Sequence, residues 1–306
     1  MTAHLARRAA GMACVLLGAV VLLFALTLFI PGNAAQILLG PRATPDAVAA
    51  YAAAMGLDRP VWVRLGLYLS HILRGDLGRD VISGRPVLAM VAEVLPNTLA
   101  LAASAIAFAL ALGVPLGCFA ATHEGSRADQ ALAVLSVAAI SVPNFVLAVL
   151  LLLAASRLPG WFPVLGGGNG AALVLPALAL GFGWVGTIAR LLRAALLEIL
   201  GADHIRTLRA YGVPGRRIVG RYALKLAAIP LAAVLGLGIG RLLGGAIFVE
   251  IVFSRPGLGT LVFDAIGTRD YPVVQGAVLV AVALFAAANL VVDAVIGWLD
   301  PRTGDA

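Results

Sequence analysis

Charged side chains are scarce in this chain, since Asp, Glu, Lys and Arg together make up 12% of its 306 residues. Hydrophobic residues make up 61%, and the mean hydropathy is +1.02. A soluble domain has about 25% charged and 45–50% apolar residues. The composition therefore predicts an all-α integral membrane protein. Basic loops at a membrane face explain the net charge of +7. Without interleaved aromatic and basic residues, we expect membrane lipid and no nucleic acid as a partner.

Lysine is nearly absent, because Lys225 is the one lysine of the chain. A P-loop needs the pattern G-x-x-x-x-G-K-[ST], whose lysine reaches the terminal phosphates of ATP. Lys225 lies between Leu224 and Leu226, so no such loop exists. Any ATP hydrolysis that this protein depends on must belong to another chain.

Histidine and cysteine are also few, and their spacing does not suit a metal or a catalytic site. They are His4, His71, His123, His204, Cys14 and Cys118. The G-x-S-x-G pattern of hydrolases is absent as well. We therefore expect no catalytic residue, no metal ligand and no cofactor bound by this chain, which argues against a membrane-bound enzyme.

Long apolar runs are what the sequence has instead, and each is long enough to cross a bilayer as a helix. They are Ala9–Ile30, Thr98–Ala121, Ala131–Ala155, Ala171–Ala189, Leu226–Val252 and Val273–Leu299. The first follows Arg7 and Arg8, as a signal peptide would, but 22 residues exceed the 7–15 of a signal core. We predict an uncleaved first span and six spans in all.

Six spans place both termini on one side of the membrane, which we predict to be the cytoplasm. The loop Thr122–Gln130 is then inside, and the loops Arg157–Gly170 and Phe253–Pro272 are outside. The polar segment Pro31–Pro96 is also outside.

Two helices are expected within this outer segment. One starts at Thr44-Pro45-Asp46 and ends at Gly56, and Val61–Leu73 forms an amphipathic helix on the outer surface. We divide the chain into residues 1–96, with the first span and this periplasmic segment, and a five-helix core at 97–306 with a basic loop at 194–230.

The basic loop is the strongest charge feature of the sequence. Between Arg193 and Lys225 it carries seven basic residues against two acidic ones, and the positive-inside rule assigns such a loop to the cytoplasm. Its pattern predicts two short helices around a turn. Asp203 is expected to cap the first helix, Gly212 to allow the break, and Pro214 to lie in the first turn of the second. One face of the first helix is apolar: Ile205, Leu208 and Tyr211. A docking element is indicated.

The stretch from His204 to Gly212 (HIRTLRAYG), followed by Ile229-Pro230, resembles the coupling-loop signature of binding-protein-dependent ABC importer permeases. The likeness is greatest to the B-type permease of the dipeptide, oligopeptide and nickel class, and it runs nearly end to end. Further matching motifs are Leu95–Thr98, Ser141–Phe145, Glu250–Gly259, Arg269–Pro272 and Asp300–Arg302.

Some positions depart from the family pattern. His204 replaces a more usual tyrosine, Leu226 an asparagine and Arg255 a tryptophan, and Pro31–Ala34 differs from the common proline-glycine-aspartate-proline. These changes leave the turn and the apolar face of the loop intact, but they weaken any naming of the solute by likeness.

The resemblance implies the six-helix fold of a type I ABC importer permease in the bacterial inner membrane. It also implies a heterodimer with a homologous six-helix permease and two ATP-binding cassette ATPases that hold ATP and Mg²⁺. A periplasmic or lipid-anchored binding protein would deliver solute for transport into the cytoplasm. This chain would be a pore-forming subunit and not an enzyme.

Two groups of candidate site residues follow. The ATPase-coupling group is Asp203, His204, Ile205, Arg206, Thr207, Leu208, Arg209, Ala210, Tyr211 and Gly212. Leu208 and Tyr211 are expected to insert into an ATPase groove, while the arginines serve electrostatic complementarity or topology alone. The translocation path and gate group is Arg241, Glu250, Ser254, Pro256, Gly257 and Asp293.

Arg241 is the sharpest candidate, because a charge inside a span is costly and must face a cavity or a partner. One reading is that it borders the path and contacts an anionic group such as a peptide carboxylate. The other is a structural ion pair with Glu250, with Asp293 or with the sister permease. The glycines around it fit tight helix packing or a path-lining helix: Gly236, Gly238, Gly240, Gly244 and Gly245.

Three alternatives concern the function itself. Short peptides are the expected solute, and a nickel or other metal chelate, glutathione or an opine-like solute stays open. A secondary transporter would show inverted repeats, and no convincing repeat is present. A membrane-bound enzyme is opposed by the missing catalytic pattern.

Overall fold

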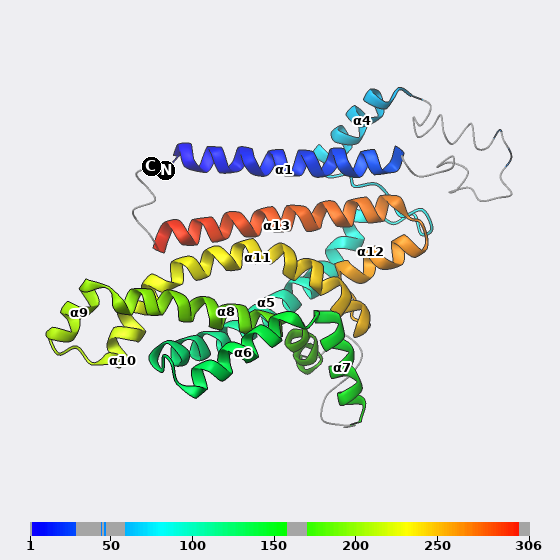
Figure 1. Cartoon of the computed structure of the whole chain (residues 1–306). Coiled ribbons are helices and arrows are strands. Elements are labelled where there is room, and N and C mark those ends of the chain that lie inside the picture. Colours follow the sequence, from blue (N-terminus) through cyan, green and yellow to red (C-terminus); the bar gives the residue numbers. More distant parts are fainter. Residues whose placement is uncertain (1, 29–43, 45, 47–58, 158–169, 300–306) are drawn as a thin grey trace. The chain divides into compact units, whose positions relative to one another are not determined.

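The computed structural model describes residues 2–28, 44, 46, 59–157 and 170–299 (Figure 1). This part of the chain is helical, and its one extended pairing is an isolated bridge between Arg79 and Pro86. Three features lie outside the described residues: the helix expected between Thr44 and Gly56, most of the loop Arg157–Gly170, and the motif Asp300–Arg302.

The helices confirm the all-α membrane class. Four of them are long and apolar enough to cross a membrane in the described part of the chain: Val87–Thr122, Val174–Gly201, Gly215–Gly236 and Tyr271–Val292. A bent pair makes up to five, and the first expected span coincides with α1 (Thr2–Leu28), described as an apolar helix over Gly11–Leu26. These helices are compatible with six spans, and that number stays a prediction.

The third expected span is a broken pair of helices and not one straight helix. Helices α6 (Arg127–Ser141) and α7 (Asn144–Ser156) meet at 96°. Val142 has φ −81° and ψ 119°, and Pro143 precedes the first residue of α7. Proline disfavours the helical conformation in the residue before it and has no N–H to continue a helix. The apolar composition of Ala131–Ala155 does not indicate this bend, whereas Pro143 within it does.

The described helices divide between two compact units, residues 1–94 with 261–286 and residues 95–260 with 287–306. The first unit contains α1, α4 (Val61–Leu73), the first turns of α5 (Val87–Thr122), most of α12 (Leu258–Gly267) and the first half of α13 (Tyr271–Leu299). The bounds of α4 agree with the sequence prediction, and none of its residues is buried. Its Tyr68, Leu69 and Ile72 pack on a small cluster formed by Val20, Leu23 and Leu279.

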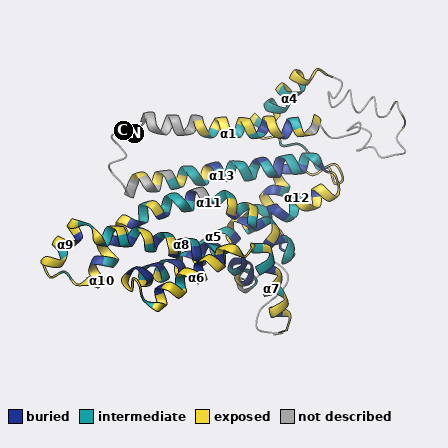
Figure 2. Cartoon of the chain, viewed as in Figure 1, coloured by how far each residue is buried: buried dark blue, intermediate teal, exposed yellow. Residues whose placement is uncertain are grey.

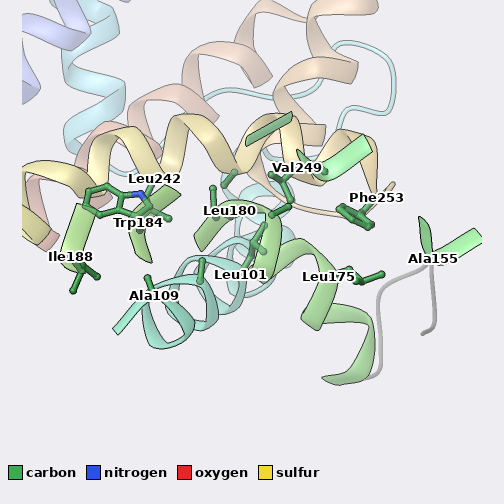
Figure 3. Close-up of a cluster of buried hydrophobic side chains, with 14 of the residues drawn as sticks. Leu101, Ala109, Ala155, Leu175, Leu180, Trp184, Ile188, Leu242, Val249 and Phe253 are labelled. Carbon is green, nitrogen blue, oxygen red and sulfur yellow. The ribbon is translucent and has the colours of Figure 1, made fainter. Parts of the chain in front are cut away.

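The second unit is organised around α8 (Val174–Gly201), which packs on α6, α7 and α11 (Leu224–Val252). Its core joins residues of α5, α7, α8 and α11, among them Leu101, Leu180, Ile188 and Leu242 (Figure 3). Between α8 and α11 lie the short helices α9 (Asp203–Ala210) and α10 (Gly215–Arg217) and a π-helical turn, Ile218–Ala223. A 3₁₀ turn at Gly170–Leu173 leads into α8.

Glycines bring the helix backbones of this unit into direct contact. A methyl group added at Gly181 of α8 would lie 2.6 Å from the Ala105 carbonyl oxygen of α5. One added at Gly186 would lie 2.5 Å from the Ser136 oxygen of α6. Only a residue without a side chain fits at these crossings, as is common where membrane helices pack.

Candidate coupling loop and membrane path

The coupling loop forms the two short helices that the sequence predicts, with one difference at the start. Ala202 is the N-cap of α9, and Asp203 is its first helical residue without a side-chain cap hydrogen bond. The prediction that Asp203 caps α9 is therefore wrong. Its exposed carboxylate still lies in the first turn, where a negative charge complements the helix dipole.

The end of α9 is a Schellman motif. The Gly212 N–H donates to the Arg209 carbonyl at 2.9 Å, and the Val213 N–H donates to the Leu208 carbonyl at 3.1 Å. The motif requires a left-handed residue, and Gly212 has φ +76°. Pro214 is then the N-cap of α10 and lies one residue before the predicted first turn.

The apolar face of α9 is divided between the chain's own interior and the surface. Ile205 is fully buried, Leu208 is half-buried, and Tyr211 is 82% exposed. Ile205 therefore fixes α9 to its own unit, and Tyr211 is left without cover. The remaining residues of the group are exposed, so α9 is largely yellow in Figure 2: Asp203, His204, Arg206, Thr207, Arg209, Ala210 and Gly212.

A partly buried ion pair fixes the same end of α8. Arg193 donates from Nε and a terminal nitrogen to the two carboxylate oxygens of Asp129 at 2.5 and 2.7 Å. Asp129 is 3% exposed, and it also accepts the Gly125 N–H. The turn before α6 and the end of α8 that leads to α9 therefore lie together. Sequence reasoning missed this pair, although Asp129 stands out as an acid beside an apolar run.

Glu250, one of the gate candidates, lies near the C-terminal end of α11, and the coupling loop precedes the N-terminal end of the same helix. It is fully buried and accepts a hydrogen bond from the Thr98 hydroxyl at 2.6 Å and one from the Gly259 N–H at 2.7 Å. The Thr98 oxygen also accepts the Leu258 N–H at 2.8 Å. This carboxylate therefore joins α5, α11 and the start of α12. The sequence indicated Thr98 only as part of the motif Leu95–Thr98, and its hydrogen bond to Glu250 was not predicted.

The turn between α11 and α12 closes over Glu250. Ser254 has φ +49° and is exposed, like Pro256. Gly257 is buried, and a methyl group there would lie 2.2 Å from the Glu250 carboxyl carbon. Arg255 is 9% exposed, and its Nε is buried without a hydrogen-bond partner among the described residues. These residues form a tight turn, as proline and glycine predict.

Arg241 lies on the exposed side of α11. Its guanidinium carbon is 5.9 Å from the centre of the Trp184 ring of α8, a cation–π contact. None of the ion pairs among the described residues includes Arg241. Glu250 is nine residues further along the helix and is held by Thr98 and Gly259, so it does not neutralise this charge. The side chain of Asp293 lies outside the described residues.

Some glycines of α11 fit tight helix packing, and another fits a helix that lines the path. A methyl group at Gly236 would lie 2.6 Å from Val292, and one at Gly238 would lie 1.7 Å from the Trp184 ring. These two glycines serve packing within the chain. No atom of the described residues lies within 4 Å of a methyl group added at Gly244, so packing among these residues does not require a glycine there.

A pair of acidic residues, Asp80 and Asp270, lies in the first unit outside the spans, and sequence reasoning missed this pair as well. Asp270 is 2% exposed and accepts the N–H groups of Val81 at 2.8 Å and Val273 at 3.1 Å. Its side chain also bonds that of Asp80. This bond lowers the pKa of Asp80 to about 2, while burial raises the pKa of Asp270. The two carboxylates therefore titrate as a pair, of which Asp80 is the more acidic.

Comparison with known proteins decides the family. A sequence model described as the inner membrane component of binding-protein-dependent transport systems matches residues 113–305, and the model of the N-terminal part of such components matches residues 1–102. The chain belongs to this family. The prediction of an ABC importer permease is thereby confirmed.

Relatives match over nearly the whole length. A dipeptide transport system permease protein of Alkalihalophilus pseudofirmus is 35% identical, with 99% of each chain covered. A probable D,D-dipeptide transport system permease protein of Escherichia coli is 37% identical, over 98% of this chain and 97% of the relative. A glutathione transport system permease protein of Salmonella choleraesuis is 36% identical, over 98% of each. The permease is thus a multi-pass inner-membrane component of a multi-subunit transport system.

Proposed function

We propose that this permease is one of two homologous membrane subunits of an ATP-driven importer of short peptides. Full-length similarity to permeases named for dipeptide, D,D-dipeptide and glutathione transport carries the proposal. These solutes share peptide bonds and at least one free carboxylate. A binding protein outside the membrane delivers the solute, and two ATPases in the cytoplasm hold ATP and Mg²⁺. A metal chelate or an opine-like solute is the alternative for the same machinery.

The ATPases dock on α9 in this proposal. A docking helix has to be fixed to its own subunit and still present a side chain to its partner. Buried Ile205 and the Asp129–Arg193 pair fix the loop, and Tyr211 is 82% exposed. We assign Tyr211 and the exposed edge of Leu208 to the ATPase groove, with the surrounding arginines adding electrostatic complementarity.

The orientation follows from the same loop. The basic coupling loop belongs in the cytoplasm, and the Asp129–Arg193 pair brings the turn Thr122–Gln130 to the same end of the unit. Both termini are then cytoplasmic, and Ser254–Gly259 lies at the outer end of α11. We propose that this turn helps to close the outer mouth. Spin-label distances across it that stay fixed through the ATP cycle would contradict that role.

The test is purification of the tagged permease in mild detergent, with native mass spectrometry and an ATPase assay of the product. We expect a second permease and two ATPase subunits, with hydrolysis stimulated by a periplasmic binding protein. The solute bound to that protein would identify the substrate. A lone chain or a homodimer that transports in proteoliposomes without an ATPase would instead establish a secondary transporter.

A further inference from the structure

The exposed side of the outer half of α11 carries one charge on an otherwise apolar face. From Arg241 to Glu250 the exposed positions are Arg241, Gly244 and Phe248, spaced i, i+3 and i+7 along one side of the helix. Phe145 of α7 extends this side, since its ring centre lies 6.2 Å from that of Phe248. We call these four residues the Arg241 face. Phe145 and Phe248 are 48% and 56% exposed.

The position of Arg241 along α11 excludes lipid as its surroundings. Arg241 is 11 residues before Val252 and 17 after Leu224. At 1.5 Å per residue these are about 17 and 26 Å from the helix ends. A bilayer core is about 30 Å thick, so a helix centred in the membrane would carry Arg241 within the core. A charge at such depth faces a water-filled path or another protein group.

Among the described residues, the side chain of Arg241 makes no hydrogen bond or ion pair, and its contact is with the Trp184 ring. Trp184 is 8% exposed, and the space for its ring on α11 exists because residue 238 is glycine. The 5.9 Å contact with Trp184 is a cation–π contact, which uses the charge of the guanidinium and none of its N–H donors. Gly244, one turn further along the same face, leaves open space beside it. The result is a positively charged donor beside open space on the exposed side of α11.

We propose that Arg241, held by Trp184, is a binding site for a carboxylate of the transported solute and makes the permease selective for anionic solutes. A planar guanidinium matches a carboxylate with two parallel hydrogen bonds. Phe145 and Phe248 provide apolar surface for a side chain of the same solute. The inference rests on the proposed import function and adds the chemical class of the solute.

The decisive experiment compares two tripeptides that differ in one group. The complete complex, with its partner permease, ATPases and loaded binding protein, is placed in proteoliposomes. Uptake of Ala-Ala-Ala is measured against that of its C-terminal amide, with glutathione as a second anionic probe. Arg241→Ala is expected to lower uptake of both acids by about tenfold or more, because both charge-assisted hydrogen bonds to the carboxylate are lost, and to change uptake of the amide by less than about twofold.

Three further variants separate binding from structure. Arg241→Lys keeps the charge without the planar fork, so intermediate uptake of the acids is expected. Trp184→Phe keeps an aromatic ring under Arg241 and should retain most of the selectivity. Arg74→Ala removes an exposed positive charge after α4 and should change neither uptake.

Several outcomes would overturn the inference. Equal loss of acid and amide uptake in Arg241→Ala, or no loss of either, would remove Arg241 from solute binding. Failure of this variant to retain the second permease would assign the site to an acidic residue of that subunit. If Asp293→Asn reproduced the effect, the partner would be Asp293. A wild-type complex that lacks ATPase activity and moves no probe would instead refute the proposed function, and this inference with it.

Discussion

Removing the Thr98 hydroxyl tests whether the buried Glu250 network holds the C-terminal end of α11. Thr98→Val keeps the shape of the side chain but deletes a hydrogen bond to a carboxylate, which contributes about 1.5–3 kcal/mol. It also leaves the buried Leu258 N–H without its acceptor, at a cost of about 1–3 kcal/mol. Because both bonds share one oxygen, we expect a total loss of about 3 kcal/mol in the free energy of unfolding.

The free energy of unfolding is measured by SDS titration of the purified permease in mixed micelles, followed by tryptophan fluorescence. Thr187→Val is the matched control, because this hydroxyl donates only within α8, to the Gly183 carbonyl at 3.1 Å. We expect the control to lose less than about 0.5 kcal/mol. A double-mutant cycle with Glu250→Gln should show coupling. If Thr98→Val were no more destabilising than the control, the network would not hold the turn.

Three other changes have defined outcomes. Gly212→Val places a branched side chain at φ +76°, where a left-handed backbone costs about 1–2 kcal/mol, and should break the end of α9 and raise ATP hydrolysis relative to uptake. Gly238→Ala brings a methyl group into the Trp184 ring and should destabilise the permease by about 1–3 kcal/mol in SDS titration. Asp80→Asn supplies a permanent donor to Asp270. In the wild type, the pKa of Asp270 is raised, so the Asp80–Asp270 hydrogen bond is strongest below that pKa and weakens as pH rises through it. The pKa of Asp80 is lowered to about 2, so this carboxylate stays ionised over the same range. Unfolding of the variant should lose this dependence at pH values above the ordinary pKa of an aspartate.

Each of these changes has a control that isolates its cause. Gly215→Ala adds a methyl group near the same turn, where nothing lies within 4 Å, and should leave coupling intact. Gly244→Ala meets no atom and should be neutral or slightly stabilising, since alanine favours helix more than glycine does. Asp264→Asn alters an exposed carboxylate of the same unit outside this pair and should keep the pH dependence of the wild type. Equal behaviour of a variant and its control would contradict the corresponding prediction.

Local signals in the sequence predicted the elements that depend on local chemistry. Val61–Leu73 has the expected bounds, because an apolar helical pattern begins directly after Pro60. The break at Gly212 was likewise predictable, because only a residue without a side chain suits a left-handed helix end. The N-cap of α9 differs from the prediction by one residue, because the choice between Ala202 and Asp203 depends on the direction in which the chain leaves α8.

Contacts between distant residues were beyond such reasoning. The Asp129–Arg193 and Thr98–Glu250 pairs join residues 64 and 152 positions apart. No local pattern relates them, although a buried charge requires a partner. The Arg241–Trp184 contact needed knowledge of which face of α8 meets α11. The sequence did supply the reason to examine Arg241, since it is a charge inside an apolar run.

The glycine crossings have a mechanical consequence. At Gly181 and Gly186 the backbones of α5, α6 and α8 touch with no side chain between them, so there is no soft layer that could shear. The Asp129–Arg193 clamp prevents the ends of α6 and α8 from splaying. Local bending of α6 or α8 is therefore not expected to absorb a displacement of α9. We therefore expect α5, α6 and α8 to move together as one rigid body when α9 is displaced.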